Sequence, residues 1–264
     1  MNKQPIGIFD SGVGGTSIWS EIHNLLPNEN TIYLADSINA PYGPKGKEAI
    51  VDLCIKNTEL LLEKGCKLIV VACNTATTNA IDYLRANYNV PFIGIEPAIK
   101  PAALQTKTNA VGILATKGTL SSKLFSETSG KFANSVTVIE QDGDGIVDLI
   151  ESGKLYSEEM KSLLRVYLKP MILANVDYLV LGCTHYPYLS PILIELLPKY
   201  VKIIDSGEAV ARQTKAILEQ NDLLNTENSI PITTRTKIEF YTNGNPKVMQ
   251  ELLENRFKIE YLDF

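Results

Sequence analysis

Leu68-Ile69-Val70-Val71-Ala72-Cys73-Asn74-Thr75 is an apolar run that ends in a cysteine followed by two polar residues. The run Tyr178-Leu179-Val180-Leu181-Gly182-Cys183-Thr184-His185 repeats this order in the second half of the chain. Continuous apolar runs, as opposed to alternating ones, are typical of strands that are covered on both faces of a parallel sheet. We therefore expect each half of the chain to place one thiol at the carboxyl end of a parallel strand, where open α/β sheets bind their ligands.

Further short apolar runs have the same character, and segments with helical spacing separate most of them. Residues 47–63, 157–173 and 208–220 place their apolar side chains mostly on one helical face. Alternating strand and helix signals predict an α/β fold with right-handed crossovers. The segments near 97–101 and 205–207 are candidate domain boundaries. The other predicted strands are residues 6–9, 31–34, 91–95, 110–114, 136–139, 201–204 and 237–241.

The composition is that of a soluble globular chain whose length lies between one large domain and two small ones. Of its 264 residues, 45% are apolar and 21% are charged, and the mean hydropathy is +0.00. A net charge of −5 leaves no cationic excess, so we expect no binding to nucleic acid. The apolar runs are too short to span a bilayer and the first residues do not resemble a secretory signal. We therefore expect no membrane association and a cytoplasmic location.

The four cysteines are too few for a disulfide framework, and a reducing cytoplasm would keep them as free thiols. Cys54 on a helical face and Cys66 just before a strand have the character of packing residues. Cys73 and Cys183 differ because each is followed by polar residues that can cap a helix and bind an anion. A helix N-terminus also lowers the pKa of a thiol from its usual value of about 8.5.

Two thiols that face each other across one site can remove a proton from a carbon centre and return one to its opposite face. That arrangement favours racemisation or epimerisation without a cofactor, and a pair of buried packing thiols is the alternative. Zinc is a further interpretation of paired cysteines. However, the chain has no Cys-x₂-Cys motif, His185 lies only two positions after Cys183, and the only other histidine is His23. These spacings do not match tetrahedral zinc sites, so we expect no metal.

Residues 6–17 read as a strand, a glycine-rich turn (Asp10-Ser11-Gly12-Val13-Gly14-Gly15) and the start of a helix. Asp36, at the end of the next strand, stands where dinucleotide-binding folds carry the acid that binds ribose. However, Ser17 replaces the third glycine of the G-x-G-x-x-G fingerprint, which disfavours a nucleotide-dependent dehydrogenase. The turn can equally let its backbone approach a small anionic ligand. Asp36 stays a candidate site residue or a structural acid.

Four motifs together resemble the aspartate/glutamate racemase family: residues 10–15 (DSGVGG), 41–43 (PYG), 73–76 (CNTA) and 182–187 (GCTHYP). They occur in the family's order, and the resemblance extends over essentially the whole chain. It implies two similar three-layer α/β domains with mainly parallel sheets and an active site in the cleft between them. Residues 1–96 plus 208–264 would form the first domain and residues 97–207 the second.

The resemblance also implies an activity, which is the interconversion of L-glutamate and D-glutamate without pyridoxal phosphate or any other cofactor. The D-glutamate would be used for bacterial peptidoglycan, and the enzyme would be a homodimer. Cys73 would remove the α-proton of D-glutamate, and Cys183 that of L-glutamate. Asp10 matches the acid beside the first thiol, His185 matches the group beside the second, and Glu151 holds the place of an assisting glutamate. The substrate ligands would be Asp10, Ser11, Pro41, Tyr42, Gly43, Asn74, Thr75, Thr184 and His185.

Two of these roles stay open. Asp10 can bond the substrate ammonium or tune Cys73, and His185 can relay a proton or orient a neighbour. The segment before Glu151 also departs from the family pattern, because Asp144 and Asp148 stand where the family commonly has prolines. The departure leaves open the role of Glu151 and the shape of that pocket wall, since a glutamate on an amphipathic helix is often only solvated.

Two other functions are alternatives. A related racemase could act on another amino acid such as aspartate, although aspartate-specific relatives tend to carry Glu after the second Cys-Thr, where this chain has His185. A non-catalytic amino-acid-binding protein is the other alternative. Binding alone would need neither Cys73 nor Cys183, so the retention of both thiols argues against it.

Overall fold

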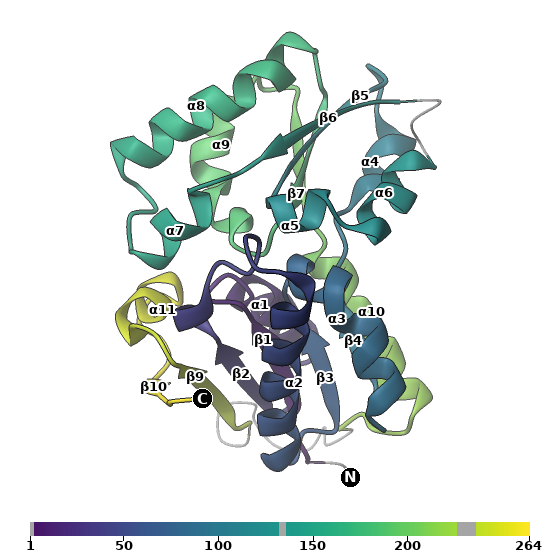
Figure 1. Ribbon diagram of the computed structural model, residues 1–264, viewed down its shortest axis with the longest axis vertical. Coiled ribbons are helices and arrows are strands. Elements are labelled where there is room, and N and C mark those ends of the chain that lie inside the picture. Colours follow the sequence, from purple (N-terminus) through teal and green to yellow (C-terminus); the bar gives the residue numbers. More distant parts are fainter. Residues whose placement is uncertain (1–2, 132–135, 226–235) are drawn as a thin grey trace.

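The computed structural model describes residues 3–131, 136–225 and 236–264, which form two α/β units, each built on its own parallel sheet (Figure 1). Strands from both ends of the chain form the larger sheet, and strands from its middle form the smaller one. Met1 and Asn2, at the start of the predicted first domain, lie outside the described residues. The two sheets confirm the predicted α/β class and the predicted parallel pairing.

Six strands form the larger sheet in the order β10-β9-β2-β1-β3-β4, and neighbouring strands pair in parallel. Every residue of the three central strands is buried, as the continuous apolar runs predicted. The strands are β1 (Ile6–Asp10), β2 (Thr31–Ala35), β3 (Leu68–Val71), β4 (Phe92–Gly94), β9 (Ile238–Thr242) and β10 (Ile259–Tyr261).

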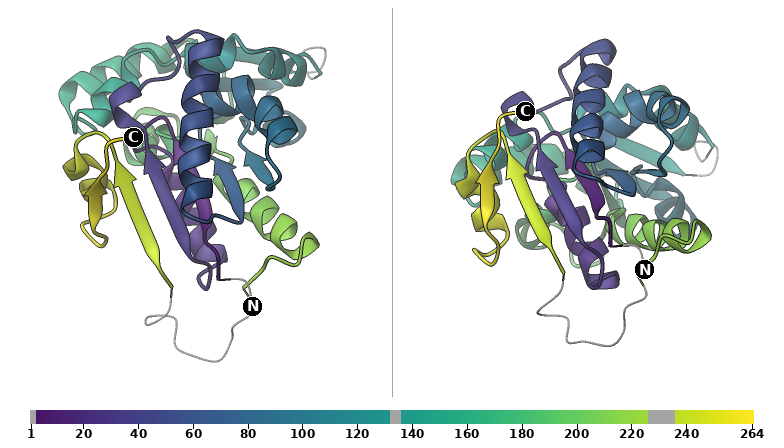
Figure 2. Two further views of the ribbon diagram at one scale, coloured as in Figure 1. Left: turned by 60° about the horizontal axis from the view of Figure 1, so that its bottom comes forward. Right: turned by 90° about the horizontal axis from the view of Figure 1, so that it is seen from below.

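Helices cover both faces of this sheet, so the larger unit has three layers. Ile8 and Val70 pack with α1, α10 and α11 on one face, whereas Phe9 and Val71 pack with α2 and α3 on the other. The alternation follows from the two-residue period of a strand. Figure 2 shows the strands side by side, with α2 in front of them. The helices are α1 (Thr16–Leu25), α2 (Lys47–Glu63), α3 (Asn74–Asn87), α10 (Gly207–Gln220) and α11 (Pro246–Leu252), with the 3₁₀ helix η1 (Ser37–Asn39).

The smaller unit repeats this layering around four parallel strands in the order β6-β5-β7-β8. Leu114 and Leu179 pack with α8 and α9, whereas Ile113 and Val180 pack with α4 and α6. The strands are β5 (Ala110–Ala115), β6 (Thr137–Asp142), β7 (Tyr178–Gly182) and β8 (Lys202–Ile204). The helices are α4 (Ile99–Gln105), α5 (Lys117–Leu120), α6 (Lys123–Gly130), α7 (Ile146–Glu151), α8 (Glu158–Leu173), η2 (Tyr186–Leu189) and α9 (Ser190–Leu196).

All nine predicted strands are present with small differences at their ends, and α2 has the predicted bounds. Strand β10 was not predicted from the sequence. It is a three-residue edge strand in which Glu260 and Tyr261 are exposed, so it carries no apolar run. Short edge strands of this kind hold their place through backbone pairing, which leaves little trace in the side-chain pattern.

The carboxyl ends of three strands determine where the site can form. Asp10 is the last residue of β1, Cys73 follows the end of β3, and Cys183 follows the end of β7 directly. The first two lie at the ends of strands of the larger sheet, and the third lies at the end of a strand of the smaller sheet. The predicted placement of both thiols at the carboxyl ends of parallel strands is therefore confirmed.

Candidate active site

Residues of both sheets line one narrow cavity between the two units, with a volume of about 10 Å³. Asp10 and Glu151 do not line it, but both hydrogen-bond to residues that do. The structure thus brings together nearly all of the residues singled out in the sequence. The predicted residues in the wall are Ser11, Pro41, Tyr42, Gly43, Cys73, Asn74, Thr75, Cys183, Thr184 and His185.

Cys73 is the N-cap residue of the 14-residue helix α3. Its sulfur accepts the N–H of Ala76 at 3.4 Å and donates to the Ser11 hydroxyl at 3.6 Å. The cap is therefore the thiol itself, and the expectation that Asn74 or Thr75 would cap this helix is wrong. The expected lowering of the thiol pKa is also wrong for this cysteine. Burial raises the pKa of Cys73 well above its usual range, and the neighbouring Asp10 carboxyl raises it further.

Asp10 is completely buried and is held by its own glycine-rich turn. One carboxylate oxygen accepts the Ser11 N–H at 2.7 Å, and the other accepts the Gly15 N–H at 2.6 Å. The second oxygen also accepts the hydroxyl of Thr184, from the opposite unit, at 3.1 Å. Burial raises the pKa of Asp10, although His185 and the Gly15 N–H act in the opposite direction. Asp10 therefore joins the two units beside the first thiol.

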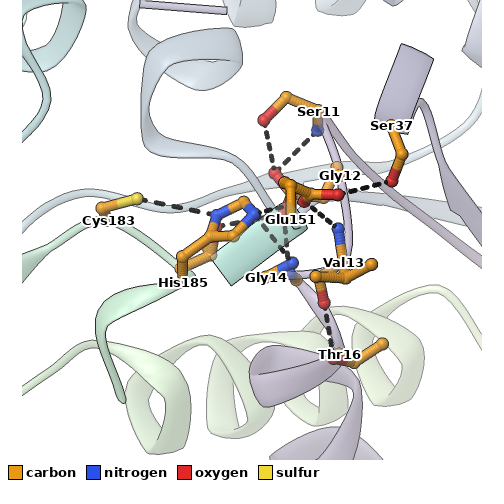
Figure 3. Close-up of polar contacts among 12 residues, drawn as sticks. Ser11, Gly12, Val13, Gly14, Thr16, Ser37, Glu151, Cys183 and His185 are labelled. Atoms are coloured by element: carbon orange, nitrogen blue, oxygen red, sulfur yellow. Dashed lines mark hydrogen bonds and ion pairs between the residues drawn. The ribbon is translucent and has the colours of Figure 1, made fainter. Parts of the chain in front are cut away.

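Cys183 has different surroundings, because the 3₁₀ helix η2 follows it in place of an α-helix and no side chain caps η2. Its sulfur lies 3.8 Å from Nδ1 of His185, and Nε2 of the same ring lies 2.6 Å from Oε1 of Glu151 (Figure 3). Burial acts to lower the pKa of His185, but hydrogen bonds to Cys183 and Glu151 outweigh it and raise that pKa well above its usual value. The expectation of a capped α-helix after Thr184 is wrong.

The glycine-rich turn accommodates side chains of the opposite unit. A Cβ atom on Gly12 would lie 1.9 Å from Oε1 of Glu151, and one on Gly14 would lie 2.2 Å from Nδ1 of His185. Between them, the N–H of Val13 donates to Oε1 of Glu151 at 2.7 Å (Figure 3). Gly12 and Gly14 thus let Glu151 and His185 reach the backbone of the turn, and the anion that this backbone binds here is the chain's own carboxylate.

Tyr42 joins the cavity wall to a buried polar network around Asp36. The Tyr42 hydroxyl donates to Asp36 at 2.5 Å, and the side-chain amide of Asn243 donates to the same carboxylate at 2.6 Å. Pro41, which precedes Tyr42, follows a cis peptide bond. Asp36 therefore supports the wall from behind and does not line the cavity. Asn243 directly follows β9, so the rule for carboxyl ends would have found it, although no sequence motif included it.

Three residues of the wall were missed in the sequence: Thr116, Val147 and Gly182. Thr116 directly follows β5, the parallel neighbour of β7, and its hydroxyl lies 2.9 Å from that of Thr75. The rule that located Cys183 at a strand's carboxyl end would also have found Thr116. Val147 had no such signal, because its place depends on how α7 packs.

The unusual segment before Glu151 forms a wider cavity of about 410 Å³ next to the narrow one. Asp144 and Asp148 line this wider cavity, which shares Pro41, Gly43, Thr116 and Val147 with the narrow one. Glu151 lies at the other end of α7, where its side chain reaches the glycine-rich turn. The aspartates therefore shape the mouth of the site and leave the contacts of Glu151 to other residues.

His23, the second histidine, lies away from the thiols on α1, where its ring stacks on Trp19 at 5.0 Å between centroids. Burial lowers the pKa of His23. Within the described ranges, no three His, Cys, Asp or Glu side chains gather closely enough to hold a metal ion. Over the same residues, no helix has the length and apolar character that crossing a bilayer requires.

Comparison with known proteins gives one family. Residues 6–214 match the profile of the Asp/Glu/Hydantoin racemase family. A glutamate racemase of Herpetosiphon aurantiacus is 47% identical over 246 residues, which are 93% of this chain and 95% of the relative. The structure of Escherichia coli glutamate racemase in complex with L-glutamate and the activator UDP-MurNAc-ala matches with a TM-score of 0.84 and 32% identity over 98% of both chains. The structure of glutamate racemase from Francisella tularensis in complex with D-glutamate matches with a TM-score of 0.82 and 28% sequence identity. The match covers 100% of this chain and 98% of that chain.

Proposed function

The chain belongs to the Asp/Glu/Hydantoin racemase family, as its motifs predicted, and we propose that it interconverts L-glutamate and D-glutamate. One observation carries the proposal: Cys73 and Cys183, from different sheets, line the same cavity. The relatives named above are glutamate racemases, two of them with glutamate bound, which supports glutamate over aspartate as the substrate.

The reaction we propose is proton exchange at the α-carbon. The thiolate of Cys73 takes the α-proton of D-glutamate, and the resulting carbanion takes a proton from the thiol of Cys183 on its opposite face. L-glutamate leaves behind Cys73 as a thiol and Cys183 as a thiolate, so the next L-glutamate reacts in the reverse direction. The raised pKa of Cys73 makes its thiolate a stronger base, which favours removal of a weakly acidic proton.

Polar groups of the wall would hold the substrate. The side-chain oxygen of Asn74 is buried without a hydrogen-bond partner among the described residues, so it can accept from the substrate ammonium. The hydroxyls of Ser11, Thr75 and Thr184 and nearby backbone N–H groups can donate to its carboxylates. A cavity of about 10 Å³ holds roughly one water molecule, so this cavity must widen before glutamate can enter.

The wider setting is also proposed. We assign residues 1–96 plus 208–264 to the first domain and residues 97–207 to the second, which is supported by the contacts of α4 with β5 and of α10 with α1. The enzyme would act in the cytoplasm as a homodimer, use no cofactor, bind neither nucleic acid nor membrane, and supply D-glutamate for peptidoglycan.

The test is an assay in D₂O without added pyridoxal phosphate or metal. Incubated with D-glutamate, the protein is expected to form L-glutamate and to replace the α-hydrogen with deuterium, as measured by circular dichroism and NMR. Parallel incubations with aspartate and other amino acids measure specificity, and faster turnover of aspartate would overturn the glutamate assignment. Glutamate binding by calorimetry, with neither exchange nor racemisation, would instead indicate a binding protein.

A further inference from the structure

Ser37 reaches across the boundary between the two units, although no sequence motif included it. It lies in η1, directly after β2 and Asp36, and its hydroxyl donates to Oε2 of Glu151 at 2.9 Å (Figure 3). Glu151 comes from α7 of the other unit, 114 positions away in the chain. The hydrogen bond therefore exists only while the two units are together.

The other oxygen of Glu151 is held just as firmly. Oε1 accepts the N–H of Val13 at 2.7 Å and lies 2.6 Å from Nε2 of His185. The side chains of Glu151 and His185 are only 14% and 1% exposed, so water offers few competing partners. With Ser37 on one oxygen and two groups on the other, the carboxylate has a single orientation.

That orientation decides which nitrogen of His185 carries a proton in the neutral ring. Nε2 also lies 3.2 Å from the backbone N–H of Gly14. Gly14 can donate only to a bare Nε2, whereas Glu151 can accept only from a protonated Nε2, so the two hydrogen bonds exclude each other. The shorter contact to the charged carboxylate favours the proton on Nε2. Nδ1 then faces the sulfur of Cys183, at 3.8 Å, with a lone pair that can take its proton.

We propose that Ser37 is a positioning residue for the Cys183 half of the reaction. By holding Oε2 of Glu151, its hydroxyl keeps Oε1 on Nε2 of His185 and reserves Nδ1 for proton exchange with Cys183. The inference rests on the proposed racemase function. Without the hydroxyl, Glu151 gains freedom to turn, and the N–H of Gly14 competes for Nε2. The proton then moves to Nδ1, where it prevents His185 from accepting one from Cys183.

The first test reads His185 directly by ¹⁵N NMR in the Ser37→Ala variant. The chain has only two histidines, so His23 on α1 serves as an internal reference. We expect the neutral ring of His185 to shift toward the form protonated on Nδ1. We also expect its pKa to fall, because without the Ser37 hydroxyl Glu151 can turn away from Nε2, which weakens a hydrogen bond that raises this pKa. Ser37→Thr, which keeps the hydroxyl, is expected to restore both readings.

Ser152→Ala is the matched control. Ser152 is the next residue after Glu151, but its hydroxyl donates to the carbonyl of Leu149 within its own helix. We expect this variant to leave the ¹⁵N signals of His185 unchanged. If Ser37→Ala and Ser152→Ala give the same His185 spectra, the proposal is overturned. This reading does not require turnover, so it decides the role of Ser37 even if the wild-type protein fails to racemise glutamate.

The second test uses kinetic isotope effects, because steady-state rates cannot show which of the two thiols has become slower. The two enantiomers have equal free energies, so kcat/KM must be equal in both directions for every variant. In Ser37→Ala we expect kcat/KM to fall about tenfold. The isotope effect should rise for L-[2-²H]glutamate, whose deuteron Cys183 removes. It should fall toward unity for D-[2-²H]glutamate, because removal by Cys73 becomes reversible. Isotope effects that change equally for both enantiomers would indicate general loosening of the site and overturn the proposal.

Discussion

The two cysteines end similar strands but have different partners. Cys73 caps a regular α-helix, accepts a backbone N–H from Ala76 and lies beside Asp10. Cys183 precedes a short 3₁₀ helix and lies beside His185, which in turn lies beside Glu151. One thiol is thus served by a helix N-terminus and a buried acid, and the other by an imidazole–carboxylate pair.

The difference has a local cause in the sequence after each thiol. Asn74 begins a helix of 14 residues, whereas Pro187 lies within the first positions of the four-residue helix η2. A single 3₁₀ turn offers little helix dipole, so it cannot assist a thiolate as a long α-helix does. We infer that His185 assists the thiolate of Cys183, as the backbone N–H groups of α3 assist the thiolate of Cys73.

The largest effect is expected from removing either thiol. Cys73→Ala and Cys183→Ala should each lower racemisation by about a thousandfold or more, because general acid–base catalysis contributes on the order of 10²–10⁴-fold and each thiol serves both directions. Each variant should still exchange one enantiomer through its remaining thiol. Cys73→Ala is expected to exchange the α-hydrogen of L-glutamate, and Cys183→Ala that of D-glutamate, as measured by ¹H NMR in D₂O.

As a control, the melting temperatures of both variants are measured, and values close to that of the wild-type protein would show that the fold is intact. Exchange of both enantiomers by Cys73→Ala would mean that this thiol is not the base for D-glutamate. Exchange of D-glutamate alone by that variant would reverse the assignment of the two thiols. Either result would contradict the proposed assignment of Cys73 to D-glutamate and Cys183 to L-glutamate.

The sequence predicted the placement of both thiols but not their surroundings. Apolar runs located β3 and β7, and the rule for carboxyl ends placed Cys73 and Cys183 at one edge. The surroundings depend on contacts between distant segments, such as the bond from Ser37 to Glu151, and single-sequence patterns do not report those. The prediction of a lowered Cys73 pKa was wrong because burial raises this pKa more than the helix N-terminus lowers it. The degree of burial also depends on contacts between distant segments.

The next prediction concerns Gly12 and Gly14 of the glycine-rich turn, which leave room for the partners of the second thiol. Gly12→Ala and Gly14→Ala should each lower kcat/KM by about a hundredfold, since a displacement near 1 Å can cost that much. A Cβ at these positions would overlap Glu151 or His185. Gly46→Ala is the matched control, because a Cβ there meets nothing within 4 Å. It is expected to stay within twofold of wild type in the same steady-state assay.

Isotope effects in the glycine variants can distinguish the two half-sites. If Gly14→Ala raises the isotope effect for L-[2-²H]glutamate and lowers it for D-[2-²H]glutamate, the His185 side depends on the turn more than the Cys73 side does. Activity close to wild type in both glycine variants would show that Glu151 and His185 do not need their contacts with the turn. That result would contradict the prediction that the turn supports the second thiol through Glu151 and His185.

The smallest effect on activity is expected at a cysteine outside both half-sites. Cys66 lies before β3, at the opposite end of that strand from Cys73, and packs against Gly7 and Leu61. Burial raises its pKa to about 12, so it stays a thiol at neutral pH. Cys66→Ala should cost about 1 kcal/mol in the free energy of unfolding, as urea denaturation would measure, and should keep kcat/KM within twofold.

A tenfold loss of kcat/KM without loss of stability would contradict the division between packing and reacting thiols. Lower stability with full activity is the expected result if the position of a cysteine along its strand determines its role. In the mechanism that we propose, a buried cysteine reacts only where strand ends of both sheets meet.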